Sequence, residues 1–451
     1  MKHIRRITAL LMCLFLLPAA ALAESQKLPL QEAHRVVYTR RTKETNRTDV
    51  CWWEVCTAHP AVTTELNSIA EGYRTDMLST MGKPRYNDAS RLEVNILNSR
   101  TGLTWMSFMV QSRYVLNKVT KDVRFTTRTY DMQTGERLLL TDIFPADSEV
   151  WSMLEDAVRE GVCAYYPGTE PDPDALEAAC RRTSIEQMDF TLHGMSLMLH
   201  LHADQFYPGK EQLIQITLYY PDIRPYMTEK AQEETDNLRY YHTVALTYDD
   251  GPNGWVTREM LNVLMQTGTR ATFFVVGSRV PGYVQYVQRE HDEGHAIASH
   301  NFQHVYASRV SRKELLSMPA KVERVHINAI GIAPAYARAP GGIWKPMADA
   351  GLGWPLIQWT AEGRDWEGDG GREPYDVYCQ ILGTARDGGI ILMHDMQKNS
   401  VVSSDMLIPA LQERGYLFLT VDELFAKDGV VLQPDTAYWR CTNGVTTNDK
   451  E

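Results

Sequence analysis

The second half of the chain, from about residue 241, alternates short apolar segments with segments of helical periodicity. Val244–Tyr248 and Ala271–Val276 predict strands, whereas Thr257–Gln266 and Val284–Glu290 predict helices. Four further strands are expected: Ala335–Ala337, Leu356–Thr360, Ile390–Met393 and Leu417–Val421. This alternation is typical of an α/β fold whose parallel sheet is closed or nearly closed into a barrel. In such folds, catalytic side chains lie at the carboxyl ends of the strands.

The first half predicts a different architecture, in which runs of strands have helices inserted between them. The expected strands are Arg91–Leu97, Leu103–Val115, Val123–Tyr130, Leu138–Asp142, Met195–Leu201 and Gln212–Tyr219, and the expected helices are Glu149–Tyr166 and Asp172–Cys180. This pattern favours a smaller α+β domain over residues 24–229. The polar segment 230–240 is interpreted as a linker to a second domain, residues 241–451, which ends in a C-terminal tail.

The composition limits the class of protein. Apolar residues make up 44% and charged residues 23%, close to the averages of soluble globular chains. These values exclude a disordered chain, a collagen-like fibre and a polytopic membrane protein. The net charge of -11 argues against nucleic acid as a partner, because such binders neutralise phosphates with basic residues.

Residues 1–23 have the three parts of a secretory signal peptide. Lys2, Arg5 and Arg6 form a basic start, Ala9–Leu17 is apolar, and Ala21-Leu22-Ala23 is an A-x-A cleavage site. We therefore expect cleavage after Ala23 and a secreted, extracytoplasmic protein associated with the cell wall. The alternative is an uncleaved leader that anchors the chain to a membrane.

Removal of the leader leaves an even number of cysteines: Cys51, Cys56, Cys163, Cys180, Cys379 and Cys441. An even number outside the cytosol favours disulfides. Pairing of neighbours predicts Cys51–Cys56, Cys163–Cys180 and Cys379–Cys441. Free buried thiols are the alternative, and a zinc cluster is disfavoured because no two of these cysteines have C-x-x-C spacing.

Polar clusters follow several predicted strands. Asp249 and Asp250 come directly after the first, and one carboxylate can bind a cation while the other accepts a proton. His300 and His304, four residues apart, can lie on one face of a helical turn and bind one metal ion. Together with Asp250 they form a facial set that leaves positions open for water and substrate.

Three later clusters complete the series. Arg338 precedes Pro340-Gly341-Gly342, Glu362 and Asp365 follow a strand beside Trp366, and Leu392-Met393-His394 ends another strand. Each cluster alone is compatible with a structural role. Five in order, each beside a predicted strand end, favour a catalytic site.

These five segments resemble the motifs of the polysaccharide deacetylase family (NodB homology, carbohydrate esterase family 4), with a match from about Thr243 to Phe425. The resemblance implies a distorted (β/α) barrel. It further implies these roles: Asp249 as catalytic base, Asp250, His300 and His304 as metal ligands, Arg338 as the arginine that orients the base, His394 as general acid, and Gly341, Pro340, Trp366 and Leu392 as oxyanion or substrate-binding residues.

The sequence departs from the family pattern at three positions. Asn301 replaces a serine or threonine, and Gly341 replaces an aromatic residue but keeps the backbone N–H. The first acid of the fourth motif is Glu362. By resemblance we expect Glu362, rather than Asp365, to hold the catalytic histidine.

The first half has a second resemblance. Tyr130–Arg137 followed by Leu140–Phe144 is similar to the extracytoplasmic module of RsiV-type anti-sigma factors. This similarity suggests a lysozyme-like protein as a partner of that domain.

The resemblance implies an exported deacetylase that depends on a divalent metal, zinc in the first place and Co²⁺ or Mn²⁺ as alternatives. Its expected substrate is peptidoglycan, from whose N-acetylglucosamine or N-acetylmuramic acid it would remove N-acetyl groups and so confer lysozyme resistance. One alternative is an O-acetyl esterase acting on a polysaccharide such as xylan. Another is a non-catalytic wall-binding or lysozyme-sensing protein.

Overall fold

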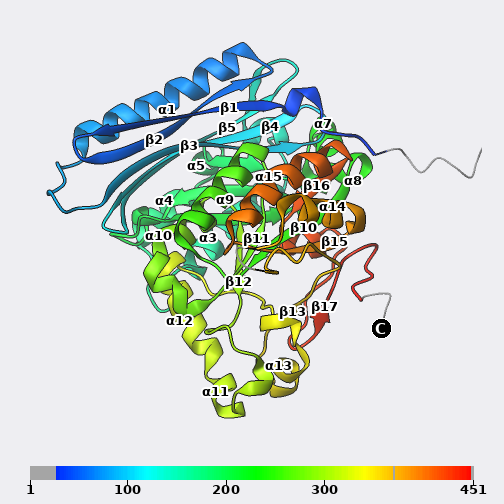
Figure 1. Cartoon of the computed structure of the whole chain (residues 1–451). Helices are drawn as coiled ribbons and strands as arrows, with labels where there is room; N and C mark the ends of the chain where they lie inside the picture. Colours follow the sequence, from blue (N-terminus) through cyan, green and yellow to red (C-terminus); the bar gives the residue numbers. More distant parts are fainter. Residues whose placement is uncertain (1–26, 369–370, 448–451) are drawn as a thin grey trace, which may run out of the picture.

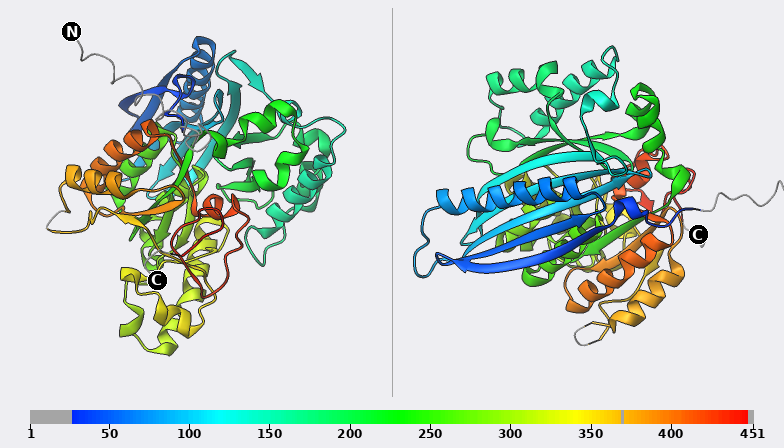
Figure 2. Two further views of the ribbon diagram at one scale, coloured as in Figure 1. Left: turned by 90° about the vertical axis from the view of Figure 1, so that its right-hand side faces the viewer. Right: turned by 90° about the horizontal axis from the view of Figure 1, so that it is seen from above.

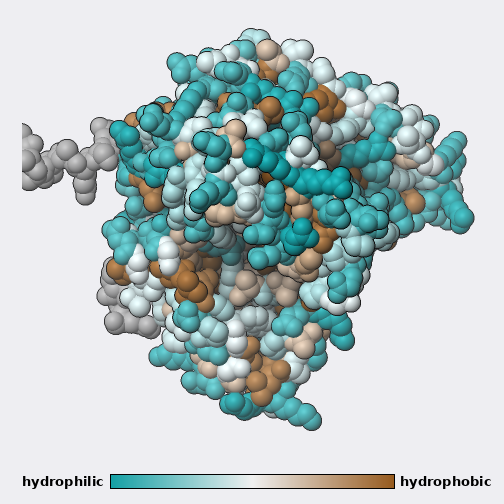
Figure 3. All heavy atoms as spheres, turned by 180° about the vertical axis from the view of Figure 1, so that it is seen from behind, coloured by the Kyte–Doolittle hydropathy of each residue, from teal (hydrophilic) through white to brown (hydrophobic). Residues whose placement is uncertain are grey.

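The computed structural model describes residues 27–368 and 371–447 (Figure 1). The predicted signal peptide, residues 1–23, lies outside the described residues. No helix of the described segments is both long and apolar enough to cross a membrane. On the face seen in Figure 3, apolar residues form separate small patches among hydrophilic ones.

The chain begins with a six-stranded sheet in which the strands follow their sequence order. Its strands are β1 (Val36–Thr45), β2 (Thr48–Thr57), β3 (Ser90–Thr101), β4 (Trp105–Leu116), β5 (Val119–Asp131) and β6 (Glu136–Leu138). Only β2 and β3 are parallel, because the long helix α1 (Pro60–Thr80) connects them across one face (Figure 1). Along α1, Val62, Leu66 and Ala70 recur every four residues and are buried in the cluster that contains Ile96 and Phe108.

Strands β1 and β2 and helix α1 were not predicted from the sequence. Most residues of β1 are exposed, so this edge strand lacks the alternation of apolar and polar residues that identifies strands. The segment predicted as a strand at Leu138–Asp142 is instead the end of β6 followed by α2 (Leu140–Ile143). The carboxylate of Asp142 accepts a hydrogen bond from the Leu139 N–H at 2.7 Å and so caps the helical turn.

A second, three-stranded sheet completes the α+β part. It consists of β7 (Asp189–Leu192), β8 (Ser196–His202) and β9 (Leu213–Tyr219), all antiparallel. Helices α3 (Val150–Ala164), α4 (Pro173–Ala179) and α5 (Arg182–Ile185) accompany it, and α6 (Tyr220–Ile223) follows. Seen from above, these helices lie on one side of the first sheet (Figure 2).

The segment predicted as a linker is ordered. It forms α7 (Glu229–Glu234) and α8 (Asn237–Tyr240). The Glu234 carboxylate accepts a hydrogen bond from the Leu103 N–H at 2.8 Å, and Asn237 is buried. Glu234 and Asn237 of this segment accept hydrogen bonds from the backbone of the turn between β3 and β4.

The second half is built on a parallel sheet, as predicted. Its strands are β10 (His242–Asp249), β11 (Thr272–Val275), β12 (Ala296–Ser299), β13 (Leu356–Ile357), β14 (Ala361–Glu362), β15 (Gly389–His394), β16 (Tyr416–Leu419) and β17 (Ala437–Tyr438). The order β12-β11-β10-β15-β14 continues from β12 through single parallel bridges at Ala337 to β13. The sheet therefore curls into the expected distorted barrel.

Helices surround this sheet. They are α9 (Gly254–Thr267), α10 (Val280–Asp292), α11 (Arg312–Leu316), α12 (Met318–Ile330), α13 (Lys345–Ala350), α14 (Pro374–Thr384), α15 (Lys398–Glu413) and α16 (Val421–Ala426). Gly268 ends α9 in the left-handed conformation, with φ 60°.

Buried charges join the two halves. Arg113 of β4 contacts Asp292 of α10 at 2.5 Å, and both side chains are almost fully buried. The Asn95 side chain donates to Glu293, which also accepts from Arg289 at 2.5 Å. Because removal of one partner leaves an uncompensated buried charge, these pairs fix how the first sheet lies against α10.

The predicted disulfides are wrong for the described structure, in which all six cysteines are free. Cys51 and Cys56 lie five residues apart in β2, so their Cα atoms are about 16 Å apart, whereas a disulfide requires less than about 7 Å. Cys379 is exposed on α14, but Cys441 is buried with its Sγ 3.3 Å from an Asp428 oxygen. Cys163 is exposed and Cys180 buried, each as a separate thiol.

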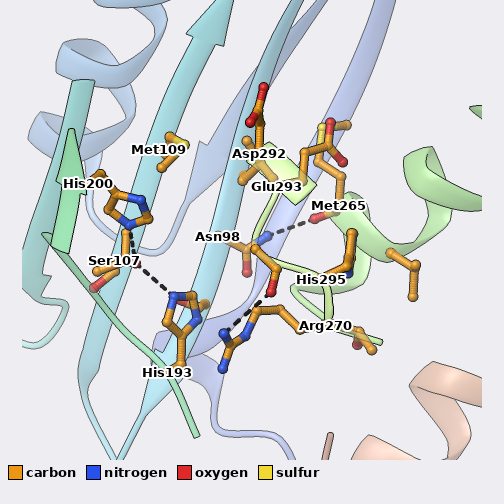
Figure 4. Close-up of a pocket in the computed structure, with 16 residues that line it drawn as sticks. Asn98, Ser107, Met109, His193, His200, Met265, Arg270, Asp292, Glu293 and His295 are labelled. Atoms are coloured by element: carbon orange, nitrogen blue, oxygen red, sulfur yellow. Dashed lines mark hydrogen bonds between the residues drawn. The ribbon is translucent and has the colours of Figure 1, made fainter. Parts of the chain in front are cut away.

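A small cavity of about 30 Å³ lies between the two halves (Figure 4). His193, His200 and His295 line it together with Arg270, and the imidazoles of His193 and His200 each lie within 2.8 Å of the Thr191 hydroxyl. Burial, and next the positive charge of Arg270, lowers the pKa of His200 and of His295 to about 3. These imidazoles are neutral in the folded protein.

We predict that this neutrality makes the fold sensitive to acid. Below pH 6.5 the unfolded chain protonates His200, whereas the folded chain does not, so this residue's contribution to stability is lost as the pH falls. The loss is about 1.4 kcal/mol per pH unit until the folded pKa is approached. The free energy of unfolding is measured by urea denaturation at several pH values between 6.5 and 4.5. In His200→Gln this free energy should fall less steeply with decreasing pH, by that amount per pH unit. The same pH dependence in both proteins would show that the imidazole of His200 is protonated in the folded state.

Candidate active site

The five polar clusters of the sequence meet at one edge of the barrel sheet. Asp249 is the last residue of β10 and pairs in register with His394, the last residue of β15. His300 follows β12, Arg338 follows the bridge residue Ala337, and Asp365 comes three residues after β14. Because the strands are parallel, these carboxyl ends lie together, as the sequence predicted.

Asp250, His300 and His304 form a compact set of ligand atoms. One ligand atom from each lies within 4.8 Å of the other two. An Asp250 oxygen is 3.3 Å from the Nε2 of His300 and 3.3 Å from the Nε2 of His304. Two imidazoles and one carboxylate are a donor set that suits Zn²⁺ and other divalent transition metals.

The surroundings fit a cation at this place. Asp250 Oδ1 is buried and makes no hydrogen bond to a described residue, although the two imidazoles lie close to it. The Nδ1 of His300 lies 2.9 Å from the Arg338 carbonyl oxygen, which accepts its proton and leaves Nε2 free to coordinate. Burial alone would raise the pKa of Asp250, but His300 and the neighbouring imidazoles lower it to about 2, so the carboxylate is ionised.

The two histidines do not lie on a helical turn, which corrects the sequence analysis. Residues 300–306 form a loop after β12, and Asn301 takes a positive φ of 66°. The Asn301 oxygen accepts the Phe302 N–H at 3.0 Å and its own N–H donates to Ser299 Oγ at 3.1 Å. Asparagine tolerates this conformation well, and the resulting bend brings the imidazole rings to 5.2 Å between centroids.

Arg338 holds the carboxylate expected to be the base. Its Nη1 donates to Asp249 Oδ1 at 2.8 Å and to Thr247 Oγ1 at 2.7 Å. Asp249 is buried beside Arg338, and its second oxygen lies 3.8 Å from the Nε2 of His300. The carboxylate therefore faces the ligand set in one fixed orientation, as its position in the motif implied.

Asp365, not Glu362, is the partner of His394. The His394 Nδ1 lies 2.8 Å from Asp365 Oδ1, and the His394 backbone N–H donates to Asp365 Oδ2 at 2.8 Å. The Glu362 carboxylate makes no hydrogen bond to a residue of the described segments. Glu362 is the last residue of β14. Asp365 lies three residues beyond the end of this strand, and its side chain contacts His394.

Ser400 supports this pair and was not identified from the sequence. It lies in the first turn of α15, and its hydroxyl donates to Asp365 Oδ2 at 2.5 Å. Burial alone would lower the pKa of His394, but the hydrogen bond and negative charge of Asp365 raise it to about 9. His394 is therefore an imidazolium at neutral pH. No sequence pattern marked Ser400, because a serine at a helix start is a common capping residue.

The remaining predicted residues divide between buried and exposed positions. Pro340 and Leu392 are buried, and Leu392 pairs in register with Thr247 of β10. Trp366 is half exposed, which leaves its indole open to a ligand. Gly341 has a positive φ of 65°, and its N–H donates to no backbone oxygen of the described residues.

Comparisons with known proteins show what this chain is similar to. Residues 240–350 match the polysaccharide deacetylase family. A chitooligosaccharide deacetylase of Bradyrhizobium sp. is 33% identical over 192 residues, which cover 39% of this chain and 86% of that protein. A solved structure described as a T48 deacetylase with substrate is 34% identical and has a TM-score of 0.41. The superposed residues cover 44% of this chain and 96% of the chain in that structure.

A third relative is similar over a longer stretch. A peptidoglycan-N-acetylglucosamine deacetylase of Listeria monocytogenes is 28% identical over 330 residues, which cover 70% of this chain and 69% of that protein. This stretch is longer than the second half of the chain, so the similarity extends into the first half. Because the matched residues cover 86% of a relative that is 33% identical, and residues 240–350 match the family itself, the chain belongs to the polysaccharide deacetylase family.

Proposed function

We propose that this protein is an exported, metal-dependent deacetylase that removes N-acetyl groups from peptidoglycan. One observation carries the proposal: a ligand set of Asp250, His300 and His304 lies at the same sheet edge as a fixed carboxylate, Asp249, and an imidazolium, His394. Hydrolysis of an acetamide needs a base for water, stabilisation of an oxyanion and an acid for the departing amine.

The proposed metal is a divalent cation, with zinc favoured by the two imidazole ligands. Bound to Asp250, His300 and His304, it would supply Lewis acidity and lower the pKa of water toward neutrality. The chain's own groups carry out the proton transfers. Asp249, held by Arg338, accepts the proton of the attacking water.

Two further groups stabilise the oxyanion and protonate the leaving group: the Gly341 N–H and His394. The Gly341 N–H has no backbone acceptor among the described residues and is available to the oxyanion. Removal of one such donor typically costs about 3–4 kcal/mol of transition-state stabilisation. His394 gives its proton to the nitrogen as the C–N bond breaks, which yields acetate and a free amine.

The substrate class is supported by the relatives. The Listeria monocytogenes relative acts on peptidoglycan N-acetylglucosamine, and a Bacillus subtilis relative, 31% identical over 181 residues, is a peptidoglycan-N-acetylmuramic acid deacetylase. Peptidoglycan lies outside the cytoplasm, which accords with the expected signal peptide. The direct test is acetate release from purified peptidoglycan by the full chain, with mass spectrometry of the products to identify the deacetylated sugar.

Chelation should abolish activity, and a divalent cation should restore it. The reason is that Asp250, His300 and His304 provide three ligands and leave the remaining positions to water and substrate. Acetate release is measured before chelation, after chelation and after addition of Zn²⁺, Co²⁺ or Mn²⁺. Full activity of metal-free protein would contradict the mechanism.

Asp249→Asn should lower kcat by at least about 100-fold while the protein still binds one metal ion, because a general base contributes about that much and the three ligands are intact. Metal analysis and acetate release on the same sample provide the two readouts. The matched variant Asp250→Asn should lose metal as well as activity. The opposite distribution of metal between the two variants would mean that the base and the ligand have been exchanged.

Asp365→Asn should shift the alkaline limb of the rate profile to lower pH. Without the charge of Asp365 the pKa of His394 falls, so the imidazolium loses its proton at a lower pH. A shift of about one to three pH units is expected from the loss of an adjacent opposite charge. Glu362→Gln is the control and should leave the limb in place. A limb that moves with Glu362→Gln alone would restore the original expectation from the motif.

A further inference from the structure

Two aromatic rings lie against the glycine pair that follows Arg338. Gly341 and Gly342 both have positive φ, 65° and 71°. A Cβ atom on Gly341 would lie 2.6 Å from Tyr306 Cε1, and one on Gly342 would lie 2.7 Å from Trp359 Cη2. A side chain on either glycine would therefore strain the loop that carries the proposed oxyanion donor and would displace one of the two rings.

The two rings have different surroundings. Trp359 packs toward the interior, where its ring lies 5.6 Å from the Arg338 guanidinium. The Tyr306 ring instead lies beside the ligand His304, at 6.3 Å between centroids. Its sequence neighbours Val305 and Ala307 contact the hydrophobic core, whereas Tyr306 lies between His304 and Gly341.

Tyr306 is held in this position. The Arg309 guanidinium lies 4.8 Å from the centroid of the ring, and the Arg309 N–H donates to the Tyr306 carbonyl oxygen at 2.8 Å. The ring is half-buried, and its hydroxyl makes no hydrogen bond to a described residue. The protein thus presents a fixed aromatic surface with a free polar group next to the cation site.

We propose that Tyr306 is a substrate-positioning residue whose ring packs against the sugar that carries the acetamide. The ring can occupy this position because Gly341 has no side chain. This inference rests on the proposed function and names a residue outside the five motifs. Sugars present a face of C–H groups beside their hydroxyls. A tyrosine, apolar in its ring and polar at its end, complements such a surface with little loss of conformational entropy.

The test is steady-state deacetylation of soluble N-acetylglucosamine oligomers by the full chain. Tyr306→Ala should raise KM about tenfold, equivalent to about 1.4 kcal/mol, with kcat within about twofold. This split is expected because the ring binds ground state and transition state equally. Tyr306→Phe should keep KM within about threefold. A loss in Tyr306→Phe as large as in Tyr306→Ala would overturn packing by the ring as the cause.

Two further variants sharpen the result. Tyr86→Ala removes a tyrosine that is 85% exposed in the first half of the chain and should leave KM and kcat unchanged. Gly341→Ala should raise KM, because the new Cβ displaces the Tyr306 ring, and should also lower kcat, because the loop with the free N–H is strained. Metal content is measured in every variant, since Tyr306 is close to His304.

Failure of the two proposals can be told apart. Absence of acetate release by the wild-type chain from every acetylated glycan would refute the proposed function. A wild-type KM in a fully metallated Tyr306→Ala variant would refute the role of Tyr306 alone. Calorimetric binding of the oligomer in the inactive Asp249→Asn background provides a readout without turnover, and Tyr306→Ala should weaken that affinity about tenfold.

Discussion

The catalytic edge of the barrel depends on one buried cation, Arg338, which has no exposed surface. Its guanidinium donates to the side chains of Thr247 and Asp249, both in β10, and to the carbonyl oxygens of Ile357, the last residue of β13, and of Gln358, which follows it. Burial of a charge is unfavourable unless it is paired and hydrogen bonded, and these four contacts meet that requirement. The same contacts tie the ends of β10 and β13 to one group. Arg338 therefore both orients Asp249, the proposed base, and joins β10 to β13 in the barrel.

Helix α10 is one of the elements through which the first half of the chain is attached to this barrel. Arg113 pairs with Asp292, and Leu213 of β9 donates its N–H to the same carboxylate at 3.0 Å. Eight residues beyond Asp292, after β12, lies the ligand His300. The contacts that hold the first half therefore also fix the helix that leads toward the proposed metal ligands. Burial raises the pKa of Glu290 in the same helix well above its usual range, so this buried residue is neutral.

Most of the site was predictable because a parallel sheet places strand ends at one edge, and Asp249 and His394 lie at the ends of predicted strands. The strand before His300, β12, was not predicted, and His300 was grouped with them through its motif. Other features were not predictable. The partner of His394 depends on where the chain leaves β14, and a spacing of three residues between Glu362 and Asp365 does not reveal it. Edge strand β1 was missed because its exposed side chains carry no alternation. Tyr306 and Ser400 came from loop and helix geometry, which local patterns do not encode.

Asp249 and His394, the two groups proposed to transfer protons, have charged partners of opposite sign. Asp249 is held by a permanent cation, Arg338, and faces the ligand set, so it is placed to accept a proton from water. His394 is held by an anion, Asp365, which raises the pKa of the imidazole to about 9 against the effect of burial and so keeps a proton available. Asp249 and His394 are paired across β10 and β15, so the proposed base and the proposed acid are neighbours in the same sheet. Because their charged partners have opposite signs, one sheet edge can hold both a carboxylate and an imidazolium at neutral pH.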